Sequence, residues 1–241
     1  MKIATWNIAR LAHSPTKIQL ACEQVRADIL ILTESDDRVC PKYKYCFHTP
    51  NPPDIEGTRF GTIRYAPTEH RVSVFTNYPC VRRHTTADEY TSLCVELETE
   101  RGNLLVYGTI IGTHDVTTVF PQDLKRQLPD FERLTADGNR LCVCGDFNCF
   151  FTGRCWPSRA GRDALLQAFS QNRMKLLTRE QPDCIDHIAI SEQFLGSDAA
   201  HIEEWNLDKK LSDHKGIAIQ FGKEGYYGRR RADYTGNTVA E

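Results

Sequence analysis

The sequence predicts an α/β fold in a single domain over residues 1–221, on the basis of two patterns. Short apolar runs such as 29–32 and 141–144 have the length of strands buried on both faces, and helical patterns alternate with them. These runs repeatedly end in asparagine, aspartate or glutamate. No internal repeat and no Pro-, Gly- and Ser-rich linker divides the chain, and α/β folds of this length often form one unit.

The first half of the chain is expected to contain one helix and three strands. Residues 3–6 form the first strand. Ser14 and Pro15 then mark a helix start, because serine is a good N-cap and proline suits the first helical position. The apolar face of this helix comprises Ile18, Cys22 and Val25. Further along, 29–32 is a strand, 40–70 a long surface loop, and 71–77 an alternating strand.

The second half is expected to begin with a hairpin, because two strand-like runs flank a glycine turn. A helix follows over 122–134, and Pro129 inside it is predicted to kink or split it. The remaining predicted elements are a strand at 141–144, a loop to residue 162, a helix at 163–171, and strands at 185–190 and 217–221.

The composition excludes several classes of protein. The net charge is −2, with 30 basic and 32 acidic residues, so nucleic acid could be bound only through local basic patches. Ten cysteines include no C-x-x-C pair, which argues against a zinc ribbon, and we expect them to be reduced. No signal-peptide pattern and no apolar run of about 20 residues is present. We therefore expect a soluble cytoplasmic protein without membrane insertion.

Residues 222–241 have little apolar content and are predicted to form a flexible C-terminal tail. Arg229, Arg230 and Arg231 could contact a polyanion. A triplet is shorter than the usual basic patch, so a solvated basic tail is the alternative.

Polar residues at the predicted strand ends suggest one polar rim above a packed sheet, because loops on a rigid scaffold often carry function. Each has an alternative explanation: Asn and Asp form turns, Glu34 could cap a helix or lie on the surface, and a lone histidine is often a satisfied loop residue. These residues are Asn7, Glu34, Asp146, Asn148, Asp186, His187, Asp213 and His214.

Five of these segments resemble, in order, the motifs of the endonuclease/exonuclease/phosphatase family, also called DNase I-like. The segments are 5–7 (TWN), 28–34 (DILILTE), 145–148 (GDFN), 185–188 (IDHI) and 212–214 (SDH). The resemblance runs from residue 1 to about 221 and implies a four-layered α/β sandwich, with two mixed β-sheets face to face and helices outside. It also implies a metal-dependent hydrolase of phosphoric esters.

The resemblance further implies roles for individual residues. Glu34 would be the principal ligand of Mg²⁺, helped by Asn7 and Asp213, and Mn²⁺ is the alternative cation. Hard oxygen ligands of this kind suit Mg²⁺. Asp146 would activate or position the attacking water, and Asn148 would hold the phosphate.

The same resemblance makes His214 either a general base or a charged donor to a phosphoryl oxygen. Asp186 would hydrogen-bond His214, fix its tautomer and favour its protonated form. A second histidine, His114, resembles one that contacts the scissile phosphate in some branches of the family.

Two departures from the family pattern concern the metal and the phosphate. Relatives of the abasic-site endonuclease type carry an aspartate where this chain has Ala9, which removes one expected metal carboxylate. They also carry a tyrosine near the strand end that matches 104–109, and here Tyr107, Thr109 and His114 are the candidates for that phosphate contact.

The loop 153–162 follows the Asp146 motif directly and contains three arginines and a tryptophan. Arg154, Trp156 and Arg159 are predicted to bind substrate by gripping phosphates and stacking on a base. The alternative is an ordinary exposed loop whose tryptophan packs on the core.

The function that follows is Mg²⁺-dependent phosphodiester hydrolysis, with DNA or RNA as the leading substrate and endo or exo action left open. The first alternative is a phosphatase or phosphodiesterase for a small-molecule or lipid phosphate ester. The second is a non-catalytic binding module that kept the fold.

Overall fold

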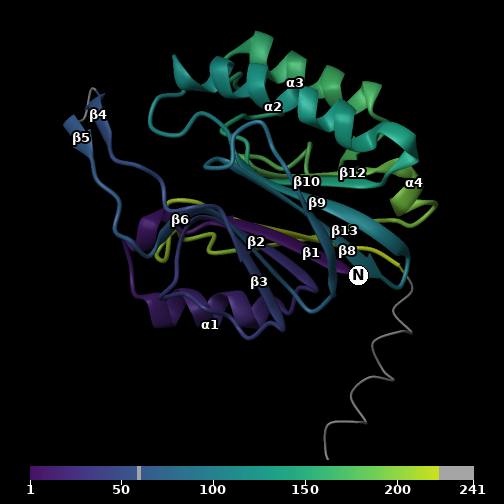
Figure 1. The fold of residues 1–241 in the computed structure, drawn as a ribbon, viewed down its shortest axis with the longest axis horizontal. Helices are drawn as coiled ribbons and strands as arrows, with labels where there is room; N and C mark the ends of the chain where they lie inside the picture. The colour runs from purple at the N-terminus through teal and green to yellow at the C-terminus, as the bar shows by residue number, and fades with distance from the viewer. Residues whose placement is uncertain (59–60, 223–241) are drawn as a thin grey trace, which may run out of the picture.

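The computed structural model describes residues 1–58 and 61–222, which form a four-layered α/β sandwich (Figure 1). Two six-stranded sheets lie face to face, with strand orders β13-β14-β1-β2-β6-β3 and β11-β12-β10-β9-β8-β7. Each sheet is mixed, because β1 and β2 are parallel, as are β9 and β10, while the other pairs are antiparallel. Helix α1 covers the outside of the first sheet, and α2 and α3 cover the second (Figure 1). The predicted fold class is confirmed.

The first sheet contains β1 (Lys2–Asn7), β2 (Ile29–Asp36), β3 (Tyr45–His48), β6 (Glu69–Thr76), β13 (His201–Trp205) and β14 (Gly216–Gln220). The second contains β7 (Cys80–His84), β8 (Ser92–Thr99), β9 (Gly102–Ile110), β10 (Leu141–Asp146), β11 (Met174–Leu176) and β12 (Asp186–Ser191). A separate hairpin consists of β4 (Ile55–Thr58) and β5 (Gly61–Ile63). The helices are α1 (Pro15–Val25), α2 (Val119–Thr135), α3 (Arg159–Gln171) and α4 (Glu192–Leu195), with two 3₁₀ turns at Ala9–Leu11 and Ala136–Gly138.

The apolar run in β2 shows why these strands contain so few polar residues. Ile29 and Ile31 point into the core between the two sheets. Leu30 and Leu32 point to the other side, into the layer shared with α1. Because successive side chains of a strand face opposite sides, a strand covered on both faces needs a continuous apolar sequence.

The helices differ from prediction mainly at their ends. Helix α1 begins at Pro15, as expected. The prediction that Pro129 splits the second helix is wrong, because α2 continues without a break through this residue. Proline removes only one hydrogen bond from a helix whose apolar face packs on the second sheet. Helix α3 begins before the predicted residue 163, because Ser158 Oγ accepts a capping hydrogen bond of 3.1 Å from Gly161 N.

The segment 40–70 is not the featureless surface loop that its composition predicts. It contains β3 and the β4–β5 hairpin, and β6 begins at Glu69. Strands β7 and β13 were also not predicted. Both lie at or next to the margin of a sheet and are mostly half-exposed or exposed, so they lack an apolar run.

The topology places the predicted motifs at one end of the sandwich. The ends of the parallel pair β1 and β2 lie on the same side of the first sheet. Strand β12 runs antiparallel to β10, so Asp186 at its start pairs with Asp146 at the end of β10. Strand β14 runs antiparallel to β1, so the segment before β14 lies at the end of β1. Strand β1 also contacts β10 and β12 across the sandwich.

Within residues 1–58 and 61–222, no helix is both long and apolar enough to cross a membrane. The predicted tail, including Arg229–Arg231, lies outside the described residues apart from Gly222. The domain boundary at residue 221 stays a prediction.

Candidate active site

Asp146 lies at the centre of the polar rim, buried at the end of β10. Its carboxylate accepts hydrogen bonds from Asn7 Nδ2 at 3.0 Å, from Asn148 N at 2.8 Å and from Asn148 Nδ2 at 3.0 Å. Burial raises the pKa of Asp146 to about 7, although the charge of His214 works against this. The three donors fix the direction of a carboxyl group that can hold or release a proton near neutral pH.

The strand end that carries Asp146 requires a glycine before it. Gly145 has a φ of +144°, and a Cβ atom there would lie 1.9 Å from the carbonyl oxygen of Thr109. A side chain at this position would therefore push β9 away from β10.

Asp186 and His214 form the second part of the site. Asp186 Oδ2 lies 2.6 Å from His214 Nδ1, and Asp186 Oδ1 accepts a hydrogen bond of 3.0 Å from the backbone N of Asn7. Burial lowers the pKa of His214, but the carboxylates of Asp186 and Asp146 outweigh it and raise this pKa to about 10. The imidazole is therefore protonated at neutral pH, with Nδ1–H bound to Asp186. Within the described residues, Nε2–H makes no hydrogen bond and has Asp213 Oδ1 3.9 Å away.

The loop that carries His214 is fixed by hydrogen bonds to the end of β1. Ser212 Oγ donates to the carbonyl oxygen of Asn7 at 2.6 Å and accepts from His214 N at 3.1 Å. Trp6 Nε1 donates to the carbonyl oxygen of His214 at 3.0 Å. The motifs at residues 5–7 and 212–214 thus hold each other in place.

Glu34 is a half-buried carboxylate at the end of β2. Its backbone has a φ of +47°, a conformation that costs a non-glycine residue free energy. Across residues 1–58 and 61–222 its carboxylate makes no hydrogen bond or ion pair. Burial raises its pKa, and Asp213 adds to this, while His214 and Arg10 oppose it. A charged oxygen donor without a partner is suited to a cation.

The other two predicted metal ligands differ in accessibility. Asp213 is 79% exposed, and its Oδ1 lies 3.9 Å from His214 Nε2. Asn7 directs Oδ1 to the backbone N of Ala9 at 2.8 Å, so one lone pair of that oxygen is already used. At this end of the described chain, the group of ligand atoms lying within 4.8 Å of one another belongs to Asp146, Asp186 and His214.

The comparisons agree with this geometry. The model of the Endonuclease/Exonuclease/phosphatase family matches residues 4–214. The chain belongs to this family. Members of the family are metal-dependent hydrolases of phosphoric esters, and this protein is an enzyme of that class. A search of the curated proteins finds no match.

Solved structures of the family show the same fold at low identity. An endonuclease/exonuclease/phosphatase from Beutenbergia cavernae is 14% identical, with a TM-score of 0.66 over 92% of this chain and 72% of that one. The 3′ phosphatase NExo from Neisseria, bound to a product DNA hairpin, is 14% identical, with a TM-score of 0.64 over 92% and 100%. Sphingomyelinase C from Streptomyces griseocarneus is 13% identical, with a TM-score of 0.59 over 92% and 99%.

The three candidates for the phosphate contact of the family motif have different partners in the structure. The hydroxyl of Tyr107 donates to Asp130 Oδ2 at 3.0 Å, and the hydroxyl of Thr109 donates to Gln127 Oε1 at 2.6 Å. Both are therefore directed at helix α2 and away from the rim. His114 instead contacts the hydroxyl of Tyr65 through Nε2.

Three residues beside His114 were not predicted. Tyr65 lies under two guanidinium groups, with Arg10 at 4.4 Å and Arg71 at 5.3 Å from the ring centroid. Arg71 is only 8% exposed, and within the described residues its Nε has no hydrogen-bond partner. Burial, followed by these two arginines, lowers the pKa of His114 to about 4. The result is a cationic and aromatic wall beside Glu34. The charges of the same two arginines lower the pKa of Glu34 and so partly offset the effect of its burial.

The loop 153–162 follows the strand end that carries Asp146 and leads into α3. Trp156 packs on Phe150, with ring centroids 5.7 Å apart, and Arg159 is the first residue of α3. Arg154 and Arg159 are exposed and form no ion pair within residues 1–58 and 61–222. Their predicted contacts with substrate stay a prediction.

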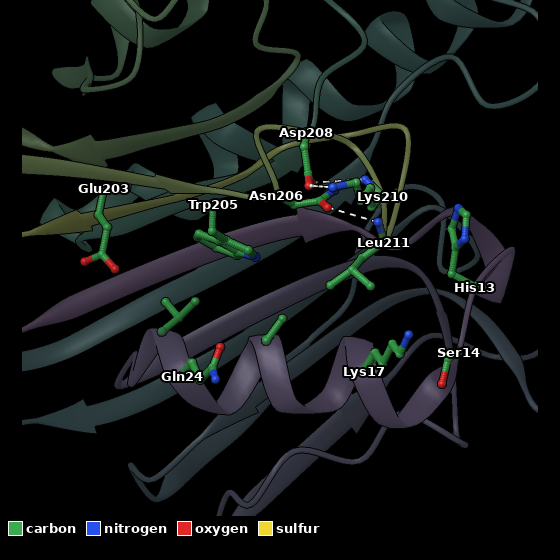
Figure 2. Close-up of a pocket in the computed structure, with 12 residues that line it drawn as sticks. His13, Ser14, Lys17, Gln24, Glu203, Trp205, Asn206, Asp208, Lys210 and Leu211 are labelled. Atoms are coloured by element: carbon green, nitrogen blue, oxygen red, sulfur yellow. Dashed lines mark hydrogen bonds and ion pairs between the residues drawn. The ribbon is translucent and has the colours of Figure 1, made fainter.

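A hollow of about 820 Å³ lies between α1 and the segment after β13 (Figure 2). Lys17 projects into it from α1, and Lys210 faces it from the other side, paired with Asp208 at 2.8 Å. Trp205 forms part of its wall (Figure 2). The segment that closes the hollow continues directly into the loop that carries His214.

His187, next to Asp186 in the sequence, has a structural role. It is fully buried, Nε2 donates to the carbonyl oxygen of Cys149 at 3.0 Å, and Nδ1 accepts from Thr178 Oγ1 at 2.9 Å. Both ring nitrogens are thus satisfied by a neutral imidazole. Burial lowers the pKa of His187 to about 4.

This histidine should make folding stability depend on pH. The folded state binds the proton less tightly than the unfolded chain, whose histidine has a pKa of about 6.5. Its contribution is therefore complete above about pH 6.5 and is lost as pH falls towards 4, by about 3 kcal/mol. Urea unfolding of the wild type and His187→Gln at pH 7 and pH 4.5 would measure this. A wild type that loses no more stability than the variant would contradict it.

Proposed function

We propose that this enzyme is a Mg²⁺-dependent phosphodiesterase whose substrate is DNA or RNA. The observation that carries the chemistry is the protonated His214, held by Asp186 and grouped within 4.8 Å with Asp146, near a Glu34 carboxylate that has no hydrogen-bond partner within the described residues. These groups supply a proton donor, a group that can accept a proton from water, and a place for a cation. Those are the functions that attack of water on phosphorus requires.

The metal would be held chiefly by Glu34, with Asp213 and the free lone pair of Asn7 Oδ1 as further donors. Two observations support a metal here. All the donors are oxygen atoms, and burial disfavours the negative charge of Glu34, which a cation would neutralise. When bound, the cation supplies charge stabilisation for the transferring phosphoryl group. Mn²⁺ is the alternative cation, and Ala9 lowers the number of carboxylates available to either.

Asp146 is proposed to position the attacking water and accept its proton. A pKa of about 7 suits a general base that works near neutral pH. Asn7 and Asn148 hold this carboxylate with their amide groups, and each amide keeps a second N–H that can reach a phosphate oxygen.

His214 is proposed to act as a charged donor rather than as a general base. Its raised pKa leaves no free lone pair at neutral pH, so it cannot take a proton from water. The Nε2–H can instead donate to a phosphoryl oxygen that gains negative charge.

The substrate class is supported by the wall that Arg71 and Tyr65 form with His114, next to Arg10, whose guanidinium is paired with Glu69. Arginine binds phosphate oxygens through paired N–H groups, and an aromatic face can stack on a base. The hollow of Figure 2 offers Lys17 as a second place for a phosphate further along a chain, since Lys210 there is paired with Asp208. A single small phosphate ester would use only one of these places.

The test is a panel of a DNA oligonucleotide, an RNA oligonucleotide, an aromatic phosphate monoester and sphingomyelin vesicles, each assayed with Mg²⁺ and with excess chelator. We expect oligonucleotide hydrolysis that the chelator abolishes. Turnover of only the monoester or the lipid would reject nucleic acid as the substrate. No turnover of any member at millimolar Mg²⁺ would reject the proposed phosphodiesterase activity.

The same assay would use Arg71→Met, which keeps the length of the buried side chain and removes its charge. Because a hydrogen bond to a charged group contributes about 1.5–3 kcal/mol, we expect KM for the oligonucleotide to rise about 10- to 100-fold. Arg38→Met is the matched control, since Arg38 is exposed and paired with Asp36. Equal effects of the two substitutions would argue against a phosphate contact for Arg71.

A further inference from the structure

A second cluster of metal-ligand side chains lies outside the proposed active site. It comprises Asp37 directly after β2, Cys46 and His48 on β3, and His70 near the start of β6. Cys46 and His48 are two residues apart on one strand, so their side chains share a face. Ligand atoms of Asp37, His48 and His70 lie within 4.8 Å of one another, and Cys46 Sγ is 3.0 Å from His48 Nε2.

The proton on His70 can be assigned from its partners. Nδ1 lies 2.7 Å from the carbonyl oxygen of Thr49, which can only accept, so Nδ1 carries a proton. Nε2 lies 3.1 Å from Asp37 Oδ1. If Nε2 carried no proton, its lone pair would face a carboxylate oxygen, and two acceptors at this distance repel each other. The contact therefore requires either a second proton on the imidazole or a metal ion that binds both atoms.

The proton on His48 follows from a chain of hydroxyl groups. Ser35 Oγ donates to the carbonyl oxygen of His70 at 3.1 Å, which uses its single hydrogen. Ser73 must then donate to Ser35 at 2.6 Å, so the contact of 2.7 Å between His48 Nδ1 and Ser73 Oγ requires a proton on Nδ1. The Nε2 lone pair of His48 is therefore directed at Cys46.

Both imidazoles thus carry their proton on Nδ1, bind a fixed oxygen with it and present Nε2. This is the arrangement in which a second hydrogen bond orients histidine as a metal ligand. A sulfur, two imidazole nitrogens and a carboxylate oxygen form a donor set that Zn²⁺ binds tetrahedrally. A thiolate and a carboxylate also balance the charge of a divalent ion.

We propose that Asp37, Cys46, His48 and His70 form a Zn²⁺ site. The thiol of Cys46 gives its proton to solvent as its sulfur binds the metal. Zinc bonds of about 2.0–2.3 Å place the ligand atoms roughly 3.3–3.8 Å apart, so the ligand atoms of Asp37, His48 and His70 need to contract by only about 1 Å. Cys46 Sγ lies outside this group of three, 3.0 Å from His48 Nε2, and its side chain would turn towards the ion. The imidazole rings, now stacked with centroids 4.6 Å apart, would rotate as they turn to the ion.

This site differs from the proposed Mg²⁺ site in chemistry and in place. Its donors include sulfur and nitrogen, which favour Zn²⁺ over Mg²⁺. Cys46 is exposed, which gives the ion an entry path. A metal here would join the segment after β2 to β3 and β6, three residues beyond Glu34.

The test uses the full chain, stripped of metal and kept in excess Mg²⁺. Zinc is titrated in competition with a chromophoric chelator, and cobalt(II) replaces it as an absorption probe. We expect one equivalent of zinc and a cobalt complex with tetrahedral absorption and a thiolate charge-transfer band. Cys46→Ser should remove this band, and both Cys46→Ser and His70→Asn should weaken zinc binding at least about 10-fold.

Cys155→Ser is the matched control, because Cys155 is also exposed but lies in the loop before α3. It should keep the zinc affinity and the charge-transfer band of the wild type. All three variants should retain the far-ultraviolet circular dichroism of the wild type. Equal zinc binding by the wild type and Cys46→Ser, or a cobalt complex without the band, would overturn the proposal.

Discussion

His214→Ala is expected to lower kcat about 10²- to 10⁴-fold, the range typical of losing a positioned proton donor. The side chain combines a pKa of about 10 with a hydrogen bond of 2.6 Å to Asp186, so its charge is present at neutral pH and its ring is fixed. Alanine removes the donor and leaves Asp146 and the metal ligands in place. The measurement is steady-state hydrolysis of the preferred phosphodiester at saturating Mg²⁺.

His201→Ala is the matched control, because His201 is an exposed histidine on β13. It should retain the activity of the wild type. Asp186→Asn adds a second readout, since the carboxylate raises the pKa of His214. The loss of activity at high pH, caused by deprotonation of His214, should then begin at a lower pH than in the wild type. Full activity in His214→Ala would reject the assigned mechanism.

Glu34→Gln should have the second large effect, on the metal. The substitution keeps the size of the side chain and removes the charge that is proposed to hold Mg²⁺. Even an outer partner of a metal ligand typically contributes 10- to 100-fold in affinity, so the Mg²⁺ concentration for half-maximal activity should rise by at least about that factor. Mg²⁺ titration of the hydrolysis rate measures this directly.

The same variant should be more stable than the wild type when both are free of metal. Burial raises the pKa of Glu34, so its charged form costs folding free energy at neutral pH, and glutamine avoids that cost. Glu98→Gln is the control, because Glu98 is exposed on β8 and should change neither Tm nor the Mg²⁺ requirement. A Glu34→Gln protein with a lower metal-free Tm and an unchanged Mg²⁺ requirement would show that Glu34 is structural.

The central strands could be predicted because their sequence reflects burial on both sides. A run such as Ile29–Leu32 has no exposed face, and its apolar residues fall into two different cores. Strands at or near the margins of the sheets, such as β7 and β13, lack this pattern because much of their surface meets solvent. The helix over residues 119–135 shows the opposite case, since the local effect of Pro129 was overridden by packing on the second sheet.

Sequence alone determined the fold class, and it identified the residues that surround Asp146 and His214. Those residues sit in short local motifs at strand ends, and a motif is a property of neighbouring positions in the chain. Tertiary structure alone decided that Tyr107 and Thr109 turn towards α2, and that Arg71 lies over Tyr65 beside His114. It also decided that His187 is a core residue while its neighbour Asp186 reaches the rim. The direction of a side chain depends on which strands become neighbours, and distant parts of the chain determine that when they pack together.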